Sequence, residues 1–340
     1  MKVNIWGLIF LALWGTGCTQ MAEAPDMGQE TKYYEVPTVE KTELVMGSYA
    51  RVRLPQKQQH LFNPVFTLFK QYEKKYSAAQ PISETSRVNF EKSRKASKGL
   101  LHLLKKAQEL KELTNGYYSP VVYVDAEQKD NVDALTIQGD LVSIKQGIRL
   151  NLGVLVPGFA VDQGVTNLKK RKVKVAILKF GGNLRCIDRC HMEISHPFIP
   201  KEGVFVIEFW TIDPDMSLAT VTLPQKLEVK YPSDKIVSAS VLSKGDATKA
   251  GAVADALTRM PLNKAIDFIK LHPESGFILF TQDRRVWISK EIKYMVEDIL
   301  WPVGKEKLKI QPDQDEEPES NNGPKAEAGL FKEGNPLGLA

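Results

Sequence analysis

Residues 151–162 read Asn-Leu-Gly-Val-Leu-Val-Pro-Gly-Phe-Ala-Val-Asp, and this stretch decides how the middle of the chain folds. Gly153 and Gly158 leave the backbone open to a closely approaching ligand, and the N–H groups at the start of a helix attract phosphate. Pro157 is acceptable in the first turn of a helix. The stretch therefore predicts a loop that opens into a helix over 154–170. Taken alone, its glycines are equally typical of ordinary turns.

On either side of this stretch, apolar periodicity predicts long helices mixed with sequential hairpins. Helices are expected over 60–76, 100–113, 246–260, 262–271 and 290–300. Strands are expected over 43–54, 121–124, 141–144, 173–180, 204–211, 218–223, 236–242, 276–280 and 285–288, with a hairpin over 185–195. Because no simple strand–helix–strand series emerges, the predicted class is α+β, a mixed sheet with helices packed on it.

The composition limits the class of protein. The 340 residues are 43% hydrophobic and 26% charged, which excludes a disordered chain, a collagen-like repeat and a coiled coil. The net charge is +5, and residues 311–340 hold seven acidic residues against two lysines, so the rest of the chain is more basic than the average. A basic body suits an anionic ligand or surface. No basic run is interleaved with aromatic residues, which argues against nucleic acid as a partner.

The N-terminus has the three parts of an export signal. Lys2 precedes an apolar run over 5–14, and small residues lead to Cys18. The apolar run is too short to span a bilayer as a helix. Residues 1–18 resemble a bacterial lipoprotein signal, although Gly15 stands where such signals usually carry Leu. The resemblance predicts a protein of the cell envelope, exported and lipid-anchored at Cys18, facing the periplasm. The alternative is an ordinary secretory signal.

The sequence suggests four parts. Residues 1–18 form the signal, and the polar segment 19–42 forms a tether. Residues 43–310 form one folded domain, and residues 311–340 form a disordered acidic tail.

Two cysteines remain after Cys18. Cys186 and Cys190 flank three residues inside the expected hairpin, close enough for a disulfide, which is the favoured state in an oxidising compartment. A metal site with His191 as third ligand is the weaker alternative, because no fourth ligand has a matching spacing. Two free thiols are the third possibility.

Several further segments look unlike ordinary packing. They are Met46-Gly47-Ser48-Tyr49, Ser83–Asn89, Thr114–Pro120, Phe180–Asn183 and Ala254–Thr258. Gly181 and Gly182 follow a buried strand and would let a bulky group approach the end of the sheet. Asp255 lies beside an apolar stripe and could enter a metal site, or it could form an i, i+4 helix pair with Arg259.

In this order, the segments resemble the ApbE-like family, the FAD:protein FMN transferases, over roughly 43–299. The family has a Met-Gly-Thr strand, a Ser-Glu-x-Ser-x-x-Asn segment, a Gly-x-Phe-Asp-Pro segment, a motif like residues 151–162, a Gly-Gly-Asn/Asp turn and an Ala-Asp-Ala-Leu-x-Thr segment. The chain matches them at Met46–Ser48, Ser83–Asn89, Gly116–Pro120, Asn151–Asp162, Gly181–Asn183 and Ala254–Leu257. The resemblance implies a T-fold-related catalytic domain.

The resemblance also implies a chemistry. Such proteins bind FAD with Mg²⁺, join FMN to a threonine hydroxyl of an acceptor protein and release AMP; some relatives hydrolyse FAD. A metal that neutralises the pyrophosphate suits phosphoryl transfer. By position, the flavin nucleotide would contact Met46, Tyr117, Tyr118, Ser119, Asp162, Gly181, Gly182 and Asn183. Mg²⁺ would be held by Asp255, by the backbone carbonyl of Val156 and, one place early, by Thr258.

The chain departs from the family pattern at charged positions. Pro157 replaces the family lysine, Asn151 and Ser119 replace aspartates, and Arg259 stands where the family has its metal-binding threonine. A cation at that position repels Mg²⁺. The histidine segment expected before the strand over 236–242 is also missing.

Two functions follow from this pattern. The first is an exported FAD:protein FMN transferase with an altered site, acting on FAD and on a threonine of an acceptor protein. The second is a degenerate member that binds FAD or a partner without turnover. If Arg259 points into the site, it could bind the pyrophosphate and replace the metal.

Overall fold

The computed structural model describes residues 36–124, 134–199, 201, 203–224, 231–303, 305 and 308–311. The chain divides after Val36, and the helices and strands of the described residues belong to the part that follows. The predicted signal over 1–18, the acidic tail beyond residue 311 and most of the predicted tether lie outside the described residues. No helix among those described is long and apolar enough to cross a membrane.

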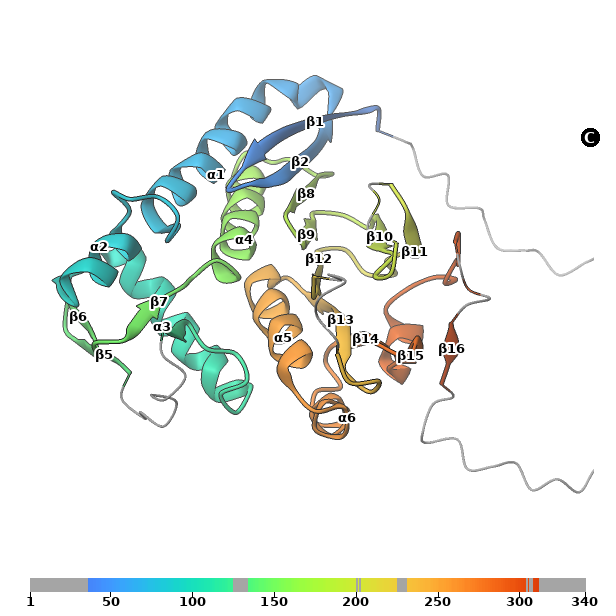
Figure 1. Ribbon diagram of the computed structural model, residues 1–340. Helices are drawn as coiled ribbons and strands as arrows, with labels where there is room; N and C mark the ends of the chain where they lie inside the picture. Colours follow the sequence, from blue (N-terminus) through green and yellow to red (C-terminus); the bar gives the residue numbers. More distant parts are fainter. Residues whose placement is uncertain are drawn as a thin grey trace, which may run out of the picture. The chain divides into compact units, whose positions relative to one another are not determined.

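A nine-stranded sheet forms the centre of the fold (Figure 1). All neighbouring strands run antiparallel, except that β15 and β16 are parallel. In sheet order the strands are β1 (Thr38–Val45), β2 (Ser48–Pro55), β8 (Ile177–Phe180), β9 (Asn183–Cys186), β12 (Met216–Thr222), β13 (Ile236–Lys244), β14 (Gly276–Thr281), β15 (Arg285–Ile288) and β16 (Lys309–Ile310).

Three smaller sheets accompany the large one. They are the pair β10 (His191–Ser195) and β11 (Phe205–Trp210), the trio β3 (Ser93–Lys95), β6 (Leu141–Ile144) and β5 (Leu135–Gln138), and the pair β4 (Val121–Tyr123) and β7 (Ile148–Leu150). The helices are α1 (Phe62–Tyr76), α2 (Glu84–Glu91), α3 (Lys98–Leu113), α4 (Leu155–Lys170), α5 (Ala247–Arg259) and α6 (Leu262–Lys270), with 3₁₀ turns η1 (Gln56–Leu61) and η3 (Lys290–Tyr294).

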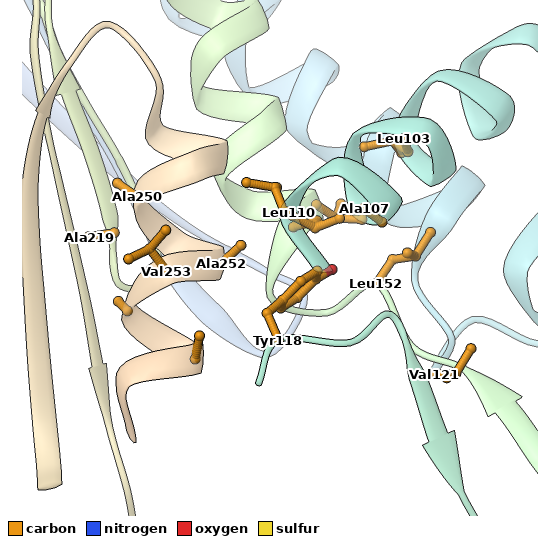
Figure 2. Packing of buried hydrophobic residues seen from close by; sticks show 14 of the residues in the cluster. Leu103, Ala107, Leu110, Tyr118, Val121, Leu152, Ala219, Ala250, Ala252 and Val253 are labelled. Atoms are coloured by element: carbon orange, nitrogen blue, oxygen red, sulfur yellow. The ribbon is translucent and has the colours of Figure 1, made fainter. Parts of the chain in front are cut away.

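The two faces of the large sheet are covered differently. Successive side chains of a strand point to opposite faces. Ala219 and Leu279 pack with α3 and α5 in one apolar cluster, whereas their neighbours Leu218 and Phe280 pack with the β10–β11 pair in another. A third cluster joins α1 and α4 to β1, β2 and β8. Figure 2 shows the layer between α3 and α5, with Tyr118 beside Leu110.

The predicted α+β class with a large sheet and packed helices is confirmed. Helix α3 ends where Asn115 and Gly116 take positive φ angles of 49° and 81°. Asp246 begins α5 as expected, because its carboxylate accepts the Lys249 N–H at 2.7 Å. Ser97 caps α3 in the same way.

Several predictions of local structure were wrong. The strand expected over 43–54 is a hairpin, whose turn at Met46 and Gly47 has φ angles of 51° and 69°. Its first strand starts at Thr38, inside the predicted tether. The expected strand over 173–180 begins only at Ile177. The expected helix over 290–300 is a single 3₁₀ turn, because the chain beyond it bridges to β11 instead.

The hairpin expected over 185–195 does not form, because its two strands belong to different sheets. Strand β9 pairs with β8 and β12, and β10 pairs with β11 in a separate sheet. The short spacer between them is therefore a link between two sheets. Cys186 and Cys190 are nevertheless joined in a disulfide, with their Cα atoms 6.3 Å apart. The disulfide fastens the end of β9 to the start of β10.

Candidate functional site

A largely buried carboxylate lies near each end of α5: Asp162 of α4 near the N-terminal end, and Asp255 of α5 itself near the C-terminal end. Asp162 accepts hydrogen bonds from the Ala247 and Thr248 N–H groups at 3.0 and 2.9 Å and from the Thr248 hydroxyl at 2.6 Å. Arg185 donates a fourth at 2.8 Å. Burial raises the pKa of Asp162, whereas the Thr248 and Ala247 hydrogen bonds and the Arg185 charge oppose the rise. Asp162 therefore fixes α5 against α4.

Arg185 extends this network to the loop before β12. Its Nε and Nη2 donate to Asp215 at 3.1 and 2.9 Å. Lys169, on the last turn of α4, also pairs with Asp215 at 2.8 Å. The network ties α4, β9 and the start of α5 together with charge-assisted hydrogen bonds, the stronger kind.

The second buried carboxylate is Asp255, one turn from the C-terminal end of α5. Arg259 donates from Nε to Oδ2 at 2.8 Å and from Nη2 to Oδ1 at 3.1 Å. The Asp255 side chain is 9% exposed and that of Arg259 is 59% exposed. The sequence offered an i, i+4 ion pair of Asp255 with Arg259 as the alternative to a metal site, and the structure contains this pair. The carboxylate is buried and the guanidinium is exposed. Both carboxylate oxygens face the cation.

Two neighbours shape the environment of this pair. The Tyr118 hydroxyl is buried with no hydrogen-bond partner among the described residues. Burial and the Asp255 charge raise the pKa of Tyr118, so the phenol stays protonated at neutral pH. Burial and then the Arg259 charge lower the pKa of Lys235. Arg259 is therefore close enough to Lys235 for the two cations to repel each other.

The turn at Met46-Gly47 joins β1 to β2, and the turn at Gly181-Gly182 joins β8 to β9. These two glycine turns lie side by side at one end of the four strands. The Gly181 N–H donates to the Tyr49 carbonyl at 3.3 Å, and a Cβ on Gly181 would lie 3.5 Å from the Ser48 hydroxyl. A Cβ on Gly182 would lie 2.1 Å from the Thr220 carbonyl oxygen, so only glycine fits against β12. Met46, in the neighbouring turn, is partly buried against two apolar clusters.

Asn183 connects these turns to α5. Its side-chain carbonyl is buried and has no hydrogen-bond partner among the described residues. A Cβ on Gly251 would lie 2.5 Å from that oxygen and 3.6 Å from the Val154 carbonyl. Gly251 stands one helical turn before Asp255, so β9, the start of α4 and the Asp255–Arg259 pair are neighbours. Buried polar atoms without partners are uncommon, and they often mark a site for a ligand or water.

An open depression of about 680 Å³ lies beside the start of α4. Asn89, Arg149, Asn151 and Gly153 are among the residues that line it. The Asn89 amide holds β7 on α2, because it donates to the Leu150 carbonyl at 2.9 Å and accepts the Leu150 N–H at 2.6 Å. The volume is in the range of small-molecule sites.

The remaining predicted contacts fall into two groups. Tyr118 is a core residue, and its N–H donates to the Thr114 hydroxyl at 3.1 Å. The Ser119 hydroxyl accepts the Val121 N–H at 3.3 Å, and Tyr117 is partly buried against the main cluster. All three therefore have a structural contact. Their contact with a flavin nucleotide, like that of Met46 and the residues of the two turns, stays a prediction.

The residues expected to hold Mg²⁺ do not fit a divalent cation. The Asp255 carboxylate is bound by a guanidinium, and the Thr258 hydroxyl donates to the Asp255 carbonyl at 2.8 Å. Val156 offers only its main chain. Within the described part of the chain, no three His, Cys, Asp or Glu side chains come together as a metal site. Mg²⁺ takes oxygen ligands and repels a neighbouring cation, so Arg259 stands in conflict with it.

Sequence reasoning missed two residues of this region. Arg185 is buried in a strand, where its five donors need carboxylates that come from distant segments. Its placement inside an apolar strand was the available signal, since a buried arginine is nearly always paired. Lys235 gave no signal, because its closeness to Arg259 depends on how α5 packs on β13.

We compared the sequence and the fold with those of known proteins. A family model described as the ApbE family matches residues 46–222. No curated protein matches the sequence. Among solved structures, the ApbE protein from Thermotoga maritima is 15% identical, with a TM-score of 0.67 over 77% of this chain and 100% of that one. The flavin transferase ApbE from Vibrio cholerae is 18% identical, with a TM-score of 0.60 over 76% and 99% of the two chains.

The apo flavinyl transferase ApbE from Pseudomonas stutzeri is 16% identical, with a TM-score of 0.63 over 76% of this chain and 96% of that one. At these identities the structures establish a shared fold. The family match spans more than half of the chain and contains both glycine turns, Asp162 and Arg185. On that ground, the protein is a member of the ApbE family.

Proposed function

We propose that the protein binds FAD between the glycine turns and α5, and that Arg259 takes the place of the metal ion in this member of the family. The observation that carries the proposal is the bidentate pair of Arg259 with the buried Asp255. In this reading the chain is a degenerate member, which holds the dinucleotide without metal-dependent FMN transfer.

The charge of the region supports an anionic ligand. The pyrophosphate of FAD carries two negative charges. Arg259 uses Nε and Nη2 for Asp255, and its Nη1 has no hydrogen bond to a described residue. An exposed guanidinium edge, fixed by a buried carboxylate, is pre-organised for a phosphate oxygen. Lys235 adds a second cation next to it.

A second candidate is the FMN transferase itself, acting on a threonine of an exported acceptor protein with release of AMP. Family membership and the likeness to proteins called flavin transferases favour it. The threonine oxygen would form a bond to the FMN phosphorus while the bond to the AMP oxygen breaks. Arg259 could then stabilise the charge on the phosphoryl oxygens, as arginines do in other phosphoryl transfers.

The proposed location is the cell envelope, with the folded domain exported and anchored through a lipid on Cys18. The signal-like residues 1–18 support this. The disulfide between Cys186 and Cys190 supports export as well, because such bonds persist in oxidising compartments.

Two assays on the full chain separate the candidates. The first is a titration with FAD in EDTA, followed by flavin fluorescence. We expect saturable binding, and an unchanged signal at high protein concentration would overturn both candidates. The second incubates the protein with FAD, Mg²⁺ and a flavin-acceptor protein, with the Vibrio cholerae flavin transferase as positive control. Absence of AMP alongside FAD binding supports the degenerate reading, whereas AMP release at the control's rate contradicts it.

A paired restoration tests the assignment of the lost chemistry. Pro157→Lys together with Arg259→Thr restores the two family residues that the resemblance implies. We expect FAD binding in EDTA to weaken about tenfold or more, since a charged hydrogen bond is lost, and AMP release to appear in the presence of Mg²⁺. Lys264→Thr, an exposed cation on α6, is the matched control and should change neither result.

A further inference from the structure

A cluster of exposed cations lies where α4 ends and β8 begins. Lys170, Arg171, Lys172 and Lys174 are all exposed, and Val173 between them is buried. Lys172 adopts a left-handed conformation with φ 59°, a position that glycine or asparagine usually occupies after a helix. A lysine is thus present at a position where its backbone is mildly strained.

The charges of this cluster are not balanced locally. None of the four has an ion pair with a described residue. Of the nearby carboxylates, Glu40 pairs with Arg51 and Arg53, and Asp215 pairs with Arg185 and Lys169. Asp188, in the loop whose Ile187 N–H donates to the Ala176 carbonyl, is the exposed acid beside the cluster. The positive charge of the cluster is therefore not neutralised by ion pairs with the described residues.

Strand register puts the cluster at the end of the sheet where the chain enters the fold. Thr38, the first residue of β1, is opposite Pro55, and Arg53 is opposite Ile177 at the start of β8. The first residues of the domain and the α4–β8 turn therefore share one end of these strands. Lys57, exposed in η1 directly after β2, adds another cation there.

The proposed nucleotide site is at the opposite end of the same strands. The turn at Met46-Gly47 closes β1 and β2, and the turn at Gly181-Gly182 closes β8 and β9. Strand β2 has eight residues, which at about 3.3 Å per residue separates the two ends by roughly 25 Å.

We infer that the α4–β8 turn docks on a bilayer surface rich in anionic phospholipid. A polybasic patch gains about 1 kcal/mol for each Lys or Arg near such a surface. The lipid at Cys18 and this cluster would be two signals, and stable membrane attachment commonly uses two. The docking would turn the glycine turns, and the site between them and α5, away from the bilayer and toward exported partners.

A membrane suits the cluster better than a protein or a nucleic acid does. Residues 19–37 form a connection that reaches up to about 60 Å when extended, so a lipid on Cys18 would hold the domain without orienting it. The cluster lies at the end of the strands where Thr38, the first residue of β1, is found. Three of its four cations are lysines, which act as point charges toward diffuse negative charge and lack the fixed fork geometry of arginine. No aromatic residue interrupts the cluster to stack on bases.

Vesicle binding by the full chain tests the inference. Sedimentation with vesicles of phosphatidylglycerol and phosphatidylcholine is compared with vesicles of phosphatidylcholine alone. The ratio of the two partition coefficients cancels the contribution of the apolar residues 5–14. We expect Lys170→Gln, Arg171→Gln, Lys172→Gln and Lys174→Gln together to lower this ratio about 1,000-fold at low salt, at about 1 kcal/mol for each charge. The wild-type ratio should fall as salt rises.

Two further variants keep the result interpretable. Arg171→Gln with Lys174→Gln should lower the ratio about 30-fold. The matched control changes four exposed lysines elsewhere to Gln, at Lys98, Lys105, Lys264 and Lys270, and should keep the wild-type ratio within about threefold. Thermal unfolding and FAD binding verify that each variant is folded. Equal ratios for the wild type and the fourfold cluster variant, or an equal loss in the control, would overturn the inference and leave the cluster to another partner.

Discussion

Two largely buried aspartates near opposite ends of α5 have different hydrogen-bond partners. Asp162 accepts four hydrogen bonds, from the first turn of α5 and from Arg185. Asp255 faces one guanidinium, which is itself exposed. The donors of Asp162 are more than twenty residues away in sequence, and the partner of Asp255 is four residues away. The carboxylate near the N-terminus of α5 is bonded to distant segments, whereas the one near the C-terminus is paired with an exposed arginine of its own helix.

This difference indicates a structural role for Asp162 and a ligand-binding role for the Asp255–Arg259 pair. A carboxylate whose two oxygens are both bonded to groups of two other elements holds those elements in place. A carboxylate with one exposed partner can share that partner with a ligand. The unpartnered Tyr118 hydroxyl and the repelling Lys235 charge belong to the Asp255 end. The C-terminal end of α5 therefore has a hydroxyl without a hydrogen-bond partner among the described residues and two neighbouring cations. An anion would gain more favourable contacts there than at the N-terminal end.

The largest expected effect is at Asp162. Asp162→Ala leaves two N–H groups of α5 and one edge of the buried Arg185 without an acceptor, so the free energy of unfolding should fall by about 3–5 kcal/mol. Urea denaturation measures it. Asp188→Ala, which removes an exposed carboxylate, should cost less than about 0.5 kcal/mol. If Asp162→Ala costs under about 1 kcal/mol, the contrast between the two aspartates fails.

Removal of the partner of Asp255 should have a smaller effect. Arg259→Gln takes both donors from a nearly buried carboxylate, but Arg259 is mostly exposed and water can replace it in part. We expect a loss of about 1–2 kcal/mol, between the values for exposed and buried pairs. A double-mutant cycle with Asp255→Asn isolates the pair. A coupling energy near zero would show that the pair does not hold in solution.

Tyr118 gives a pH test of the same end. Its pKa in the folded chain is raised above the ordinary value of about 10, so above pH 10 the unfolded chain loses the proton first. The free energy of unfolding then falls by about 1.4 kcal/mol for each pH unit from this group. Tyr118→Phe should lack this part of the slope and should change stability little at pH 7, because it removes a hydroxyl without a partner.

The control for this experiment is Tyr294→Phe, which changes an exposed ring. Both variants are compared with the wild type by denaturation between pH 7 and pH 11. The same slope for Tyr118→Phe and the wild type above pH 10 would contradict the burial of the phenol.

Local sequence determines part of this structure. The leucines of α3 repeat at helical spacing, and Asp246 caps α5, so both helices could be predicted from neighbours alone. The Asp255–Arg259 pair is also local, since an i, i+4 spacing places both side chains on one face. These features need no knowledge of which strands pair.

The remaining features depend on distant partners. Strand β9 pairs with Ser217 and Ala219 of β12, and this long-range pairing overrides the hairpin that its short spacer indicated. The chain after Tyr294 bridges to Glu208 and Thr211, which overrides its helical spacing. Likewise, the donors of Asp162 come from segments that no spacing rule connects to it.

The most direct test of the central claim is the effect of Mg²⁺ on FAD affinity. Isothermal titration of the full wild-type chain with FAD, once in EDTA and once in Mg²⁺, gives two dissociation constants. If Arg259 replaces the metal, the two constants should agree within about twofold. An affinity that rises tenfold or more with Mg²⁺ would contradict the account, because Arg259 would then have to leave Asp255 to admit the ion.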